Sequence, residues 1–252
     1  MTRIPTEPGS NDPPEISSEA VQRFFEERAR KISTLGPLRA VIYQDKHPDL
    51  AERRDAAEKA GLLPKLELSG TERLLDVGCG TGRWAPALLP AVAHYHGVDS
   101  SEGLVAFARS HFFATKAKFT SVPAGEISLE RLGEIEAFDR IFCAGLLIYM
   151  NDRMVDDALS AMVGVAAKRC RIVMREPVGI EKRLTLREHY SDELAQTYNA
   201  IYRTEDELRD MIDRVMGPMG FRVSDSGDVF EDTALNNRRE TRQRWLVVER
   251  AS

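Results

Sequence analysis

Three glycines that follow a short apolar run place the strongest constraint on what this chain can fold into. Residues 73–77 read Arg-Leu-Leu-Asp-Val, and Gly78, Gly80 and Gly82 then lead into a helical run at 84–92. Glycine permits positive φ angles and lets the backbone approach a ligand closely. The N–H groups at the start of the following helix have no intrahelical acceptor. The segment therefore predicts a strand, a ligand-binding turn and a helix, in that order.

The spacing of these glycines argues against a dinucleotide as the ligand. A dinucleotide fingerprint reads G-x-G-x-x-G, but Arg83 stands three residues after Gly80, where that pattern requires its third glycine. Asp76, two residues before Gly78, adds a carboxylate that would repel a pyrophosphate and attract a cationic sulfonium. The pattern therefore favours a positively charged ligand.

Around this turn the sequence alternates between short apolar runs and amphipathic runs. The expected strands lie at 73–77, 95–98, 118–122, 138–144 and 171–174, and the expected helices lie at 84–92, at 102–113 and from Asp152 onward. Strands that alternate with helices imply right-handed crossovers and a mostly parallel sheet covered on both faces.

The last third of the chain reads differently. A capping box at Thr204–Glu207 predicts a helix to about Val215. Two later strands, from Gly220 and at 244–249, are expected to pair as an antiparallel hairpin at the sheet edge. We therefore predict an α/β, Rossmann-like, doubly wound sheet of seven strands, mostly parallel, with an antiparallel C-terminal hairpin.

Composition divides the chain into regions. Residues 1–15 are proline-rich and polar, and are expected to form a flexible tail. Residues 16–69 are expected to form an N-terminal helical cap, with helices at about 18–33 and 48–61. Residues 70–252 form the main domain, in which an insertion at about 177–203 is expected to cover the carboxyl edge of the sheet as a lid.

With these motifs in place, the sequence resembles the class I S-adenosylmethionine (SAM)-dependent methyltransferases over about residues 70–176. Asp76-Val77-Gly78-Cys79-Gly80-Thr81-Gly82 matches the first motif of that family, and Gly97-Val98-Asp99-Ser100-Ser101 matches the second. The resemblance implies that Asp99 hydrogen-bonds both ribose hydroxyls. It also implies that Gly125 and Glu126, a Glu where Asp is usual, lie near the adenine, and that the strand at 138–144 ends near the transferable methyl.

The resemblance makes residues 70–252 a SAM-binding methyltransferase domain, with S-adenosylhomocysteine (SAH) as the product of its cofactor. The cofactor-binding residues that it implies are Asp76, Gly78, Cys79, Gly80, Gly82, Asp99, Ser100, Gly125, Glu126 and Cys143.

The acceptor is expected beyond the carboxyl ends of the strands. The candidate substrate-binding residues there are Tyr43, Tyr149, Arg175, Tyr198, Tyr202 and Arg203. Tyr198 and Tyr202 are four residues apart and would share a face of a helix. Arg203 precedes the helix capped by Thr204, and together they would form an anion pocket; a solvated lid is the competing interpretation.

His189 is the candidate catalytic residue. Its side chain is expected to act as a general base because the unperturbed pKa of histidine lies near neutrality, and an exposed loop histidine is the competing interpretation. Arg53 and Arg54 could reach a ligand, but an exposed helical face is favoured for both. His94 and His96 share one face of a strand with no third ligand nearby in sequence, so no metal site is predicted.

Net charge limits the class of partner that is expected, and cysteine usage indicates the cellular compartment. With 35 Lys and Arg against 40 Asp and Glu the formal net charge is −5, which disfavours nucleic acid and anionic membranes as partners. Three cysteines without paired spacing, and the absence of a recognisable signal or membrane-spanning segment, favour a cytoplasmic protein. A homodimer is left open.

We therefore expect a SAM-dependent methyltransferase that acts on an oxygen or nitrogen of a small molecule, with an acidic, sugar-like or secondary-metabolite acceptor. Two alternatives remain. One is methylation of RNA or protein, for which the basic run at 237–244 is the only cue, and the other is a non-catalytic SAM-binding protein.

Overall fold

A central sheet of seven strands organises the computed structural model, which describes residues 2–7, 10, 13–236 and 238–250. The strands are β2 (Arg73–Val77), β3 (His94–Asp99), β4 (Lys118–Ser121), β5 (Phe138–Ala144), β6 (Ala166–Gly179), β9 (Phe221–Asp228) and β10 (Thr241–Arg250). Their order is β4-β3-β2-β5-β6-β10-β9, in which the first five are parallel and β10 is antiparallel to both of its neighbours. The predicted fold class is confirmed.

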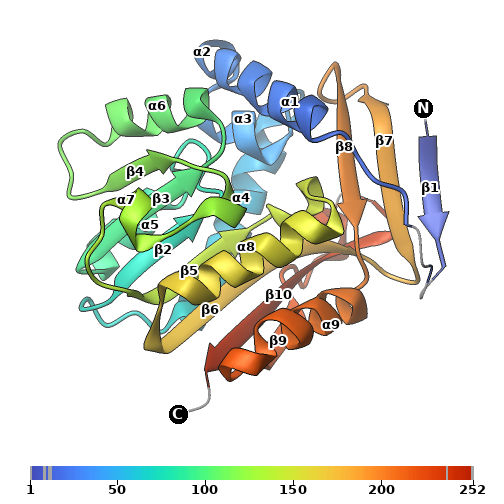
Figure 1. The fold of residues 1–252 in the computed structure, drawn as a ribbon. Helices are drawn as coiled ribbons and strands as arrows, with labels where there is room; N and C mark the ends of the chain where they lie inside the picture. The colour runs from blue at the N-terminus through green and yellow to red at the C-terminus, as the bar shows by residue number, and fades with distance from the viewer. Residues whose placement is uncertain (1, 8–9, 11–12, 237, 251–252) are drawn as a thin grey trace.

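Helices cover both faces of this sheet (Figure 1). They are α4 (Pro48–Leu62), α5 (Ala85–Leu88), α6 (Glu102–His111), α7 (Leu129–Leu132), α8 (Asp152–Val165) and α9 (Glu205–Val215). Short 3₁₀ turns follow or join them: η1 (Leu63–Leu66), η2 (Leu89–Ala91), η3 (Ala124–Glu126), η4 (Leu147–Tyr149), η5 (Gly217–Met219) and η6 (Thr233–Leu235). The capping box predicted at the start of α9 is present.

Two separate cores pack on the sheet because successive strand residues point to opposite faces. Leu75 and Ile141 belong to the core shared with α7, α8 and α9. Their sequence neighbours Leu74 and Phe142 belong to the other core, shared with α4, α5 and α6. Burial of apolar surface on both faces holds the strand ends, and the loops that follow them, in fixed positions.

A second, smaller sheet stands beside the carboxyl end of the first (Figure 1). It is formed by β1 (Thr2–Thr6), β7 (Arg183–Ser191) and β8 (Gln196–Tyr202), in the order β1-β7-β8. The cap helices α1 (Ser18–Arg30), α2 (Ile32–Leu35) and α3 (Pro37–Ile42) precede α4, and α1 packs on β8.

The expected flexible tail at 1–15 is therefore wrong for residues 2–6, which pair antiparallel with β7 from Thr2–Arg187 to Thr6–Arg183. Pro5 is tolerated because β1 lies at the edge of its sheet, where the missing N–H has no partner to lose. Residues 1, 8–9 and 11–12 lie outside the described part of the chain.

The segment expected as a lid, 177–203, contains the β7–β8 hairpin rather than a helix. Tyr198 and Tyr202 still share a face, as expected, but they do so through the two-residue period of strand β8.

A buried arginine ties the cap together. Arg28 is fully buried, and its Nη1 and Nη2 donate to the two carboxylate oxygens of Asp45, each over 2.7 Å. Its Nε and Nη2 also donate to the carbonyls of Ala40 and Arg39. These bonds fix the turn after α3, where Tyr43 has a left-handed backbone (φ 64°).

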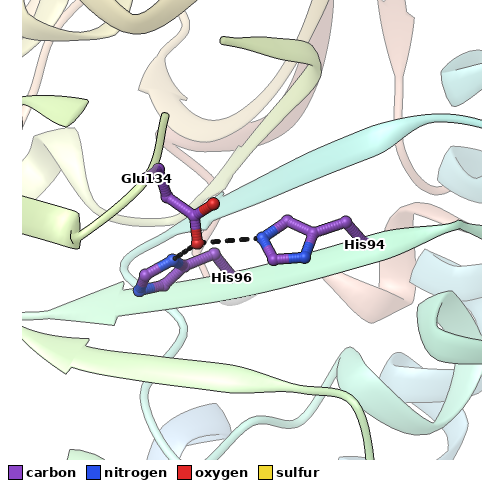
Figure 2. Close-up of side chains that lie close together, drawn as sticks. All are labelled: His94, His96 and Glu134. Atoms are coloured by element: carbon purple, nitrogen blue, oxygen red, sulfur yellow. Dashed lines mark hydrogen bonds and ion pairs between the residues drawn. The ribbon is translucent and has the colours of Figure 1, made fainter. Parts of the chain in front are cut away.

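A cluster of side chains around one carboxylate, that of Glu134, lies near the amino-terminal ends of the central strands (Figure 2). His94 Nε2 and His96 Nδ1 lie 3.0 and 2.9 Å from Glu134 Oε1. Lys118 Nζ donates to the same oxygen, and Arg73 donates to Oε2 over 2.6 Å. Burial by itself raises the pKa of Glu134, but hydrogen bonds from Lys118 and His96 outweigh it and hold that pKa at about 2.

His94, His96 and Glu134 could hold a metal ion, since their ligand atoms lie within 4.8 Å of one another. The cations of Lys118 and Arg73 already neutralise Glu134, however, and Lys118 occupies the shared oxygen. Because a carboxylate only accepts, neutral His96 carries its proton on Nδ1, and its Nε2 accepts from the Thr120 hydroxyl over 2.8 Å. The cluster therefore cross-links β2, β3, β4 and the segment before β5.

Glu134→Gln should lower the free energy of unfolding by about 2 kcal/mol, because it removes the buried carboxylate that accepts charge-assisted hydrogen bonds from Arg73 and Lys118. The lowered pKa of Glu134 stabilises the fold above the ordinary glutamate pKa, so the wild type should lose this contribution as the pH falls from 4.5 towards about 2, and the variant should not. Urea unfolding at several pH values measures both the loss of unfolding free energy and its dependence on pH. Glu136→Gln is the matched control, because Glu136 also pairs with Arg73 but is exposed. Equal losses in the two variants would contradict this role of Glu134.

Candidate active site

The glycine turn after β2 is held against the end of β3. Gly78, Gly80 and Gly82 all have positive φ, at 78°, 55° and 76°. The carbonyl of Val98 accepts the N–H groups of Gly78 and Cys79, over 2.8 and 2.9 Å. A side chain at Gly82 would also collide with the ring of Phe112, because its Cβ would lie 2.7 Å from Cε2 of that ring. Glycine is therefore required here for backbone conformation and for space.

Asp99, the last residue of β3, connects this turn to α6. Its Oδ2 accepts from the N–H of Gly80 and its Oδ1 accepts from the N–H of Ser101, each over 2.9 Å. Burial raises the pKa of Asp99, and the hydrogen bonds from Ser101 and Gly80 partly oppose that rise. Each oxygen keeps a free lone pair, so the carboxylate can still accept two hydroxyl groups.

The turn and Asp99 border a cavity of about 550 Å³. The cavity lies beyond the carboxyl ends of β2, β3, β5 and β6, which is the edge where sheets of this kind bind ligands. Of the predicted cofactor residues, five line it: Gly78, Cys79, Gly80, Asp99 and Ser100.

The other predicted cofactor residues do not line the cavity. Asp76 is 2% exposed and accepts from the Tyr95 hydroxyl over 2.6 Å, and burial raises its pKa to about 7. Gly82 packs under Phe112, and Cys143 is buried in the core shared with α8.

The two residues expected near the adenine also lie outside the cavity lining. Gly125 packs against Asp157 of α8, and the exposed Glu126 pairs with Arg131 over 2.9 Å.

Aromatic side chains also line the cavity. They include the four tyrosines expected from the sequence to bind the substrate: Tyr43, Tyr149, Tyr198 and Tyr202. Arg175 lines it as well. Phe24 and Phe25 of α1 pack in the aromatic core beside β8 and also line this cavity. The ring of Phe25 meets that of Tyr149 edge to face, with centroids 5.0 Å apart.

Arg203 does not form the expected anion pocket. It is 2% exposed, and its guanidinium donates to the Asp152 carboxylate and to the carbonyls of Leu147 and Met150. Every side of the group is thus occupied by the protein, and Arg203 is outside the cavity lining. It fixes η4, the turn that carries Tyr149.

His189, the candidate base, lies on β7 and is half-buried. Its ring packs against Tyr198, with centroids 5.6 Å apart, and it is Tyr198 that lines the cavity. Burial is the largest cause that lowers the pKa of His189, and the positive charges of Arg238 and Arg3 lower it further.

Charged residues of α4 form a part of the site that the sequence did not predict. Glu58 is buried and lines the cavity; its Oε2 accepts from Arg83 over 2.8 Å and its Oε1 accepts from Arg175. Burial alone raises the pKa of Glu58, but Arg175 and Arg83 reverse this and set it at about 2. Arg54, expected on an exposed face, is 6% exposed and lines the cavity. The signal in the sequence was spacing, since positions 54 and 58 share one face of a helix.

No helix in the described ranges has the length and apolar character needed to cross a membrane.

Comparison with known proteins agrees with this geometry. Residues 74–169 match the family described as a methyltransferase domain. The ubiquinone biosynthesis O-methyltransferase of Aromatoleum aromaticum is 34% identical over 83 residues, which cover 32% of this chain and 34% of that protein. The phosphoethanolamine N-methyltransferase 1 of Zea mays is 24% identical over 159 residues, covering 62% of this chain and 29% of that protein. The chain thus spans about a third of the length of the curated relatives it matches.

Solved structures share the fold over nearly the whole chain. Magnesium protoporphyrin IX methyltransferase from Synechocystis PCC 6803 with bound SAM has a TM-score of 0.59 at 18% identity, over 96% of this chain and 100% of that one. A Haemonchus contortus phosphoethanolamine N-methyltransferase 1 has a TM-score of 0.66 at 16% identity, over 92% of this chain and 49% of that one. Over residues 74–169 the chain is thus similar to methyltransferase domains, and solved methyltransferase structures share its fold.

Proposed function

We propose that this protein transfers the methyl group of SAM to an oxygen or nitrogen of a small molecule. One observation carries the proposal: the glycine turn and Asp99 line the same cavity as the tyrosines and arginines beyond β5 and β6. A cofactor at the first group and an acceptor at the second would therefore meet within one enclosed space.

The chemistry asks little of the protein beyond alignment. SAM, when bound, supplies an already activated methyl group, so the transfer is an in-line displacement that proximity and exclusion of water promote. Asp99 would orient the ribose by accepting its hydroxyls. The aromatic side chains of α1, η4 and β8 would exclude water around the acceptor.

The size of the cavity supports a small acceptor, because about 550 Å³ lies within the range of small-molecule sites. Two of the relatives are named for a small molecule: one for its acceptor, phosphoethanolamine, and one for its pathway, ubiquinone biosynthesis. Among the described residues of the basic run, Arg242 and Arg244 pair with Asp228, which reduces the charge available to RNA.

A non-catalytic role is the second candidate, since fold alone does not establish a reaction. Proteins of this fold also carry out reactions other than methyl transfer, since a [4+2]-cyclase, SpnF, shares it with a TM-score of 0.65 at 18% identity. The activity measurement below separates the two.

Methyl transfer should be detected when the protein is incubated with SAM labelled in its methyl group and a small-molecule extract of the source cells. We expect labelled product in the small-molecule fraction and none in purified tRNA or protein. Binding of SAH without any labelled product would favour the non-catalytic candidate, and label in tRNA or protein would replace the small-molecule assignment.

Asp99→Ala should weaken SAH binding about 10- to 100-fold, because it removes charge-assisted hydrogen bonds to the ribose of about 1–3 kcal/mol. Calorimetry measures this. Glu102→Ala is the control, since it removes an exposed carboxylate from the first turn of α6. The wild-type affinity should also fall as the pH drops through the raised pKa of Asp99, whereas the variant should show no such fall. Unchanged affinity in Asp99→Ala would refute the ribose role.

His189→Ala should lower kcat less than about tenfold and should leave the shape of the pH–rate profile unchanged. The reason is that His189 contacts the cavity only through Tyr198, so we propose a positioning role for it. A loss of about 10²–10⁴-fold, together with loss of one limb of the profile, would instead identify His189 as the general base.

A further inference from the structure

Arg54 carries a buried guanidinium whose hydrogen-bond donors find no partner among the described residues. It lies on α4, is 6% exposed and lines the cavity. Its Nε and Nη1 are buried and have no hydrogen-bond partner among the described residues. A buried polar group without a partner is costly, and a charged one more so, unless a ligand completes it.

The neighbouring arginines differ from Arg54 in this respect. Arg83 donates to Asp55 and Glu58, and Arg175 donates to Glu58. Glu58 is therefore shared by two cations, and it makes no hydrogen bond to Arg54. Since a guanidinium does not lose its proton in proteins, Arg54 keeps its charge.

We propose that Arg54 binds an anionic group of the acceptor, a carboxylate or a phosphate. This inference rests on the proposed function, because it identifies the substrate class of the same site. A guanidinium matches the planar geometry of a carboxylate and the oxygens of a phosphate, and desolvation in the cavity strengthens the pair.

The position of Arg54 favours the acceptor over the carboxylate of the cofactor. The charges that act on Arg54 are those of Glu58, Arg175 and Glu193. Arg175 lies within β6, in register with Ala144, the last residue of β5, and Glu193 lies in the β7–β8 turn. Asp99, at the end of β3, is not among the charges that act on Arg54. The guanidinium of Arg54 is therefore nearer to Arg175 and Glu193 than to the ribose position.

The surroundings of Arg54 indicate the rest of the ligand. Phe24, Phe25, Tyr43 and Tyr149 line the same cavity, and neighbouring rings meet at steep angles, such as 82° between Tyr43 and Tyr149. Such a surface accepts an apolar or aromatic body. The substrate class is therefore a small acid or phosphate ester with an apolar body, methylated at a hydroxyl or amino group.

The first experiment follows the charge of the labelled product. Methyl label transferred from SAM into a small-molecule extract should elute as an anion on an anion-exchange column at pH 7. Arg54→Gln should reduce that product at least tenfold. Arg53→Gln, which removes an exposed charge from the adjacent position of α4, should leave it unchanged. Label in neutral or cationic product, or equal yields in both variants, would overturn the inference.

The second experiment separates the acceptor from the cofactor. Calorimetry should give Kd values for SAH that differ less than about threefold between the wild type and Arg54→Gln. 5′-Methylthioadenosine, which lacks the amino-acid carboxylate, provides the comparison. If Arg54→Gln weakened SAH tenfold but left methylthioadenosine unchanged, Arg54 would bind the cofactor carboxylate, and the inference would fall.

The third experiment does not depend on activity. Inorganic phosphate should raise the melting temperature of the SAH-loaded protein, relative to chloride at equal ionic strength, and Arg54→Gln should abolish the rise. If phosphate stabilises the protein through Arg54 but no extract is methylated, the proposed function fails while the anion site stands. If phosphate has no effect on the wild type, the anion site fails.

A structural role for Arg54 is tested by Arg54→Met, which keeps an unbranched side chain without its charge. Because the buried donors of Arg54 make no hydrogen bond in the free protein, the melting temperature of the variant should equal or exceed that of the wild type. A lower melting temperature would assign Arg54 to the fold and overturn the inference.

Discussion

The carbonyl of Val98 and the carboxylate of Asp99 hold the glycine turn, and the rest of the site depends on this attachment. Val98 accepts two N–H groups of the turn, and Asp99 accepts a third from Gly80. The turn follows β2 and both acceptors belong to β3, so parallel pairing of these two strands places them together. The same sheet then brings β5 and β6 alongside, whose ends line the rest of the cavity.

The cavity is closed by elements that lie outside the matched domain. The Arg28–Asp45 pair fixes the cap, and buried Arg203 fixes η4, so that Tyr43 and Tyr149 meet across the cavity. Arg28, Arg83 and Arg203 each donate to a carboxylate. The buried Nε and Nη1 of Arg54 have no such partner among the described residues, and buried donors left unpaired inside a cavity are the expected mark of a site completed by a ligand.

Local signals were sufficient to predict the central sheet, the glycine turn and Asp99, because strand periodicity and glycine spacing are properties of neighbouring residues. Two other features depend on distant parts of the chain. The strand β1 exists because β7, about 180 residues away, offers it an edge, and Arg54 lines a cavity that residues of the cap and of the β7–β8 turn also line. The β7–β8 hairpin did carry a local signal, since Leu184 and Leu186 alternate with polar residues, but its Tyr and Arg content was interpreted as a lid.

A crystal structure of the complex with SAH would show directly whether the glycine turn and Asp99 hold the cofactor. We expect both ribose hydroxyls to donate to Asp99 and the sulfur to face the space between Tyr149 and Arg54. A complex in which the ribose lies away from Asp99, or in which the sulfur faces away from the aromatic half of the cavity, would refute this arrangement of the site.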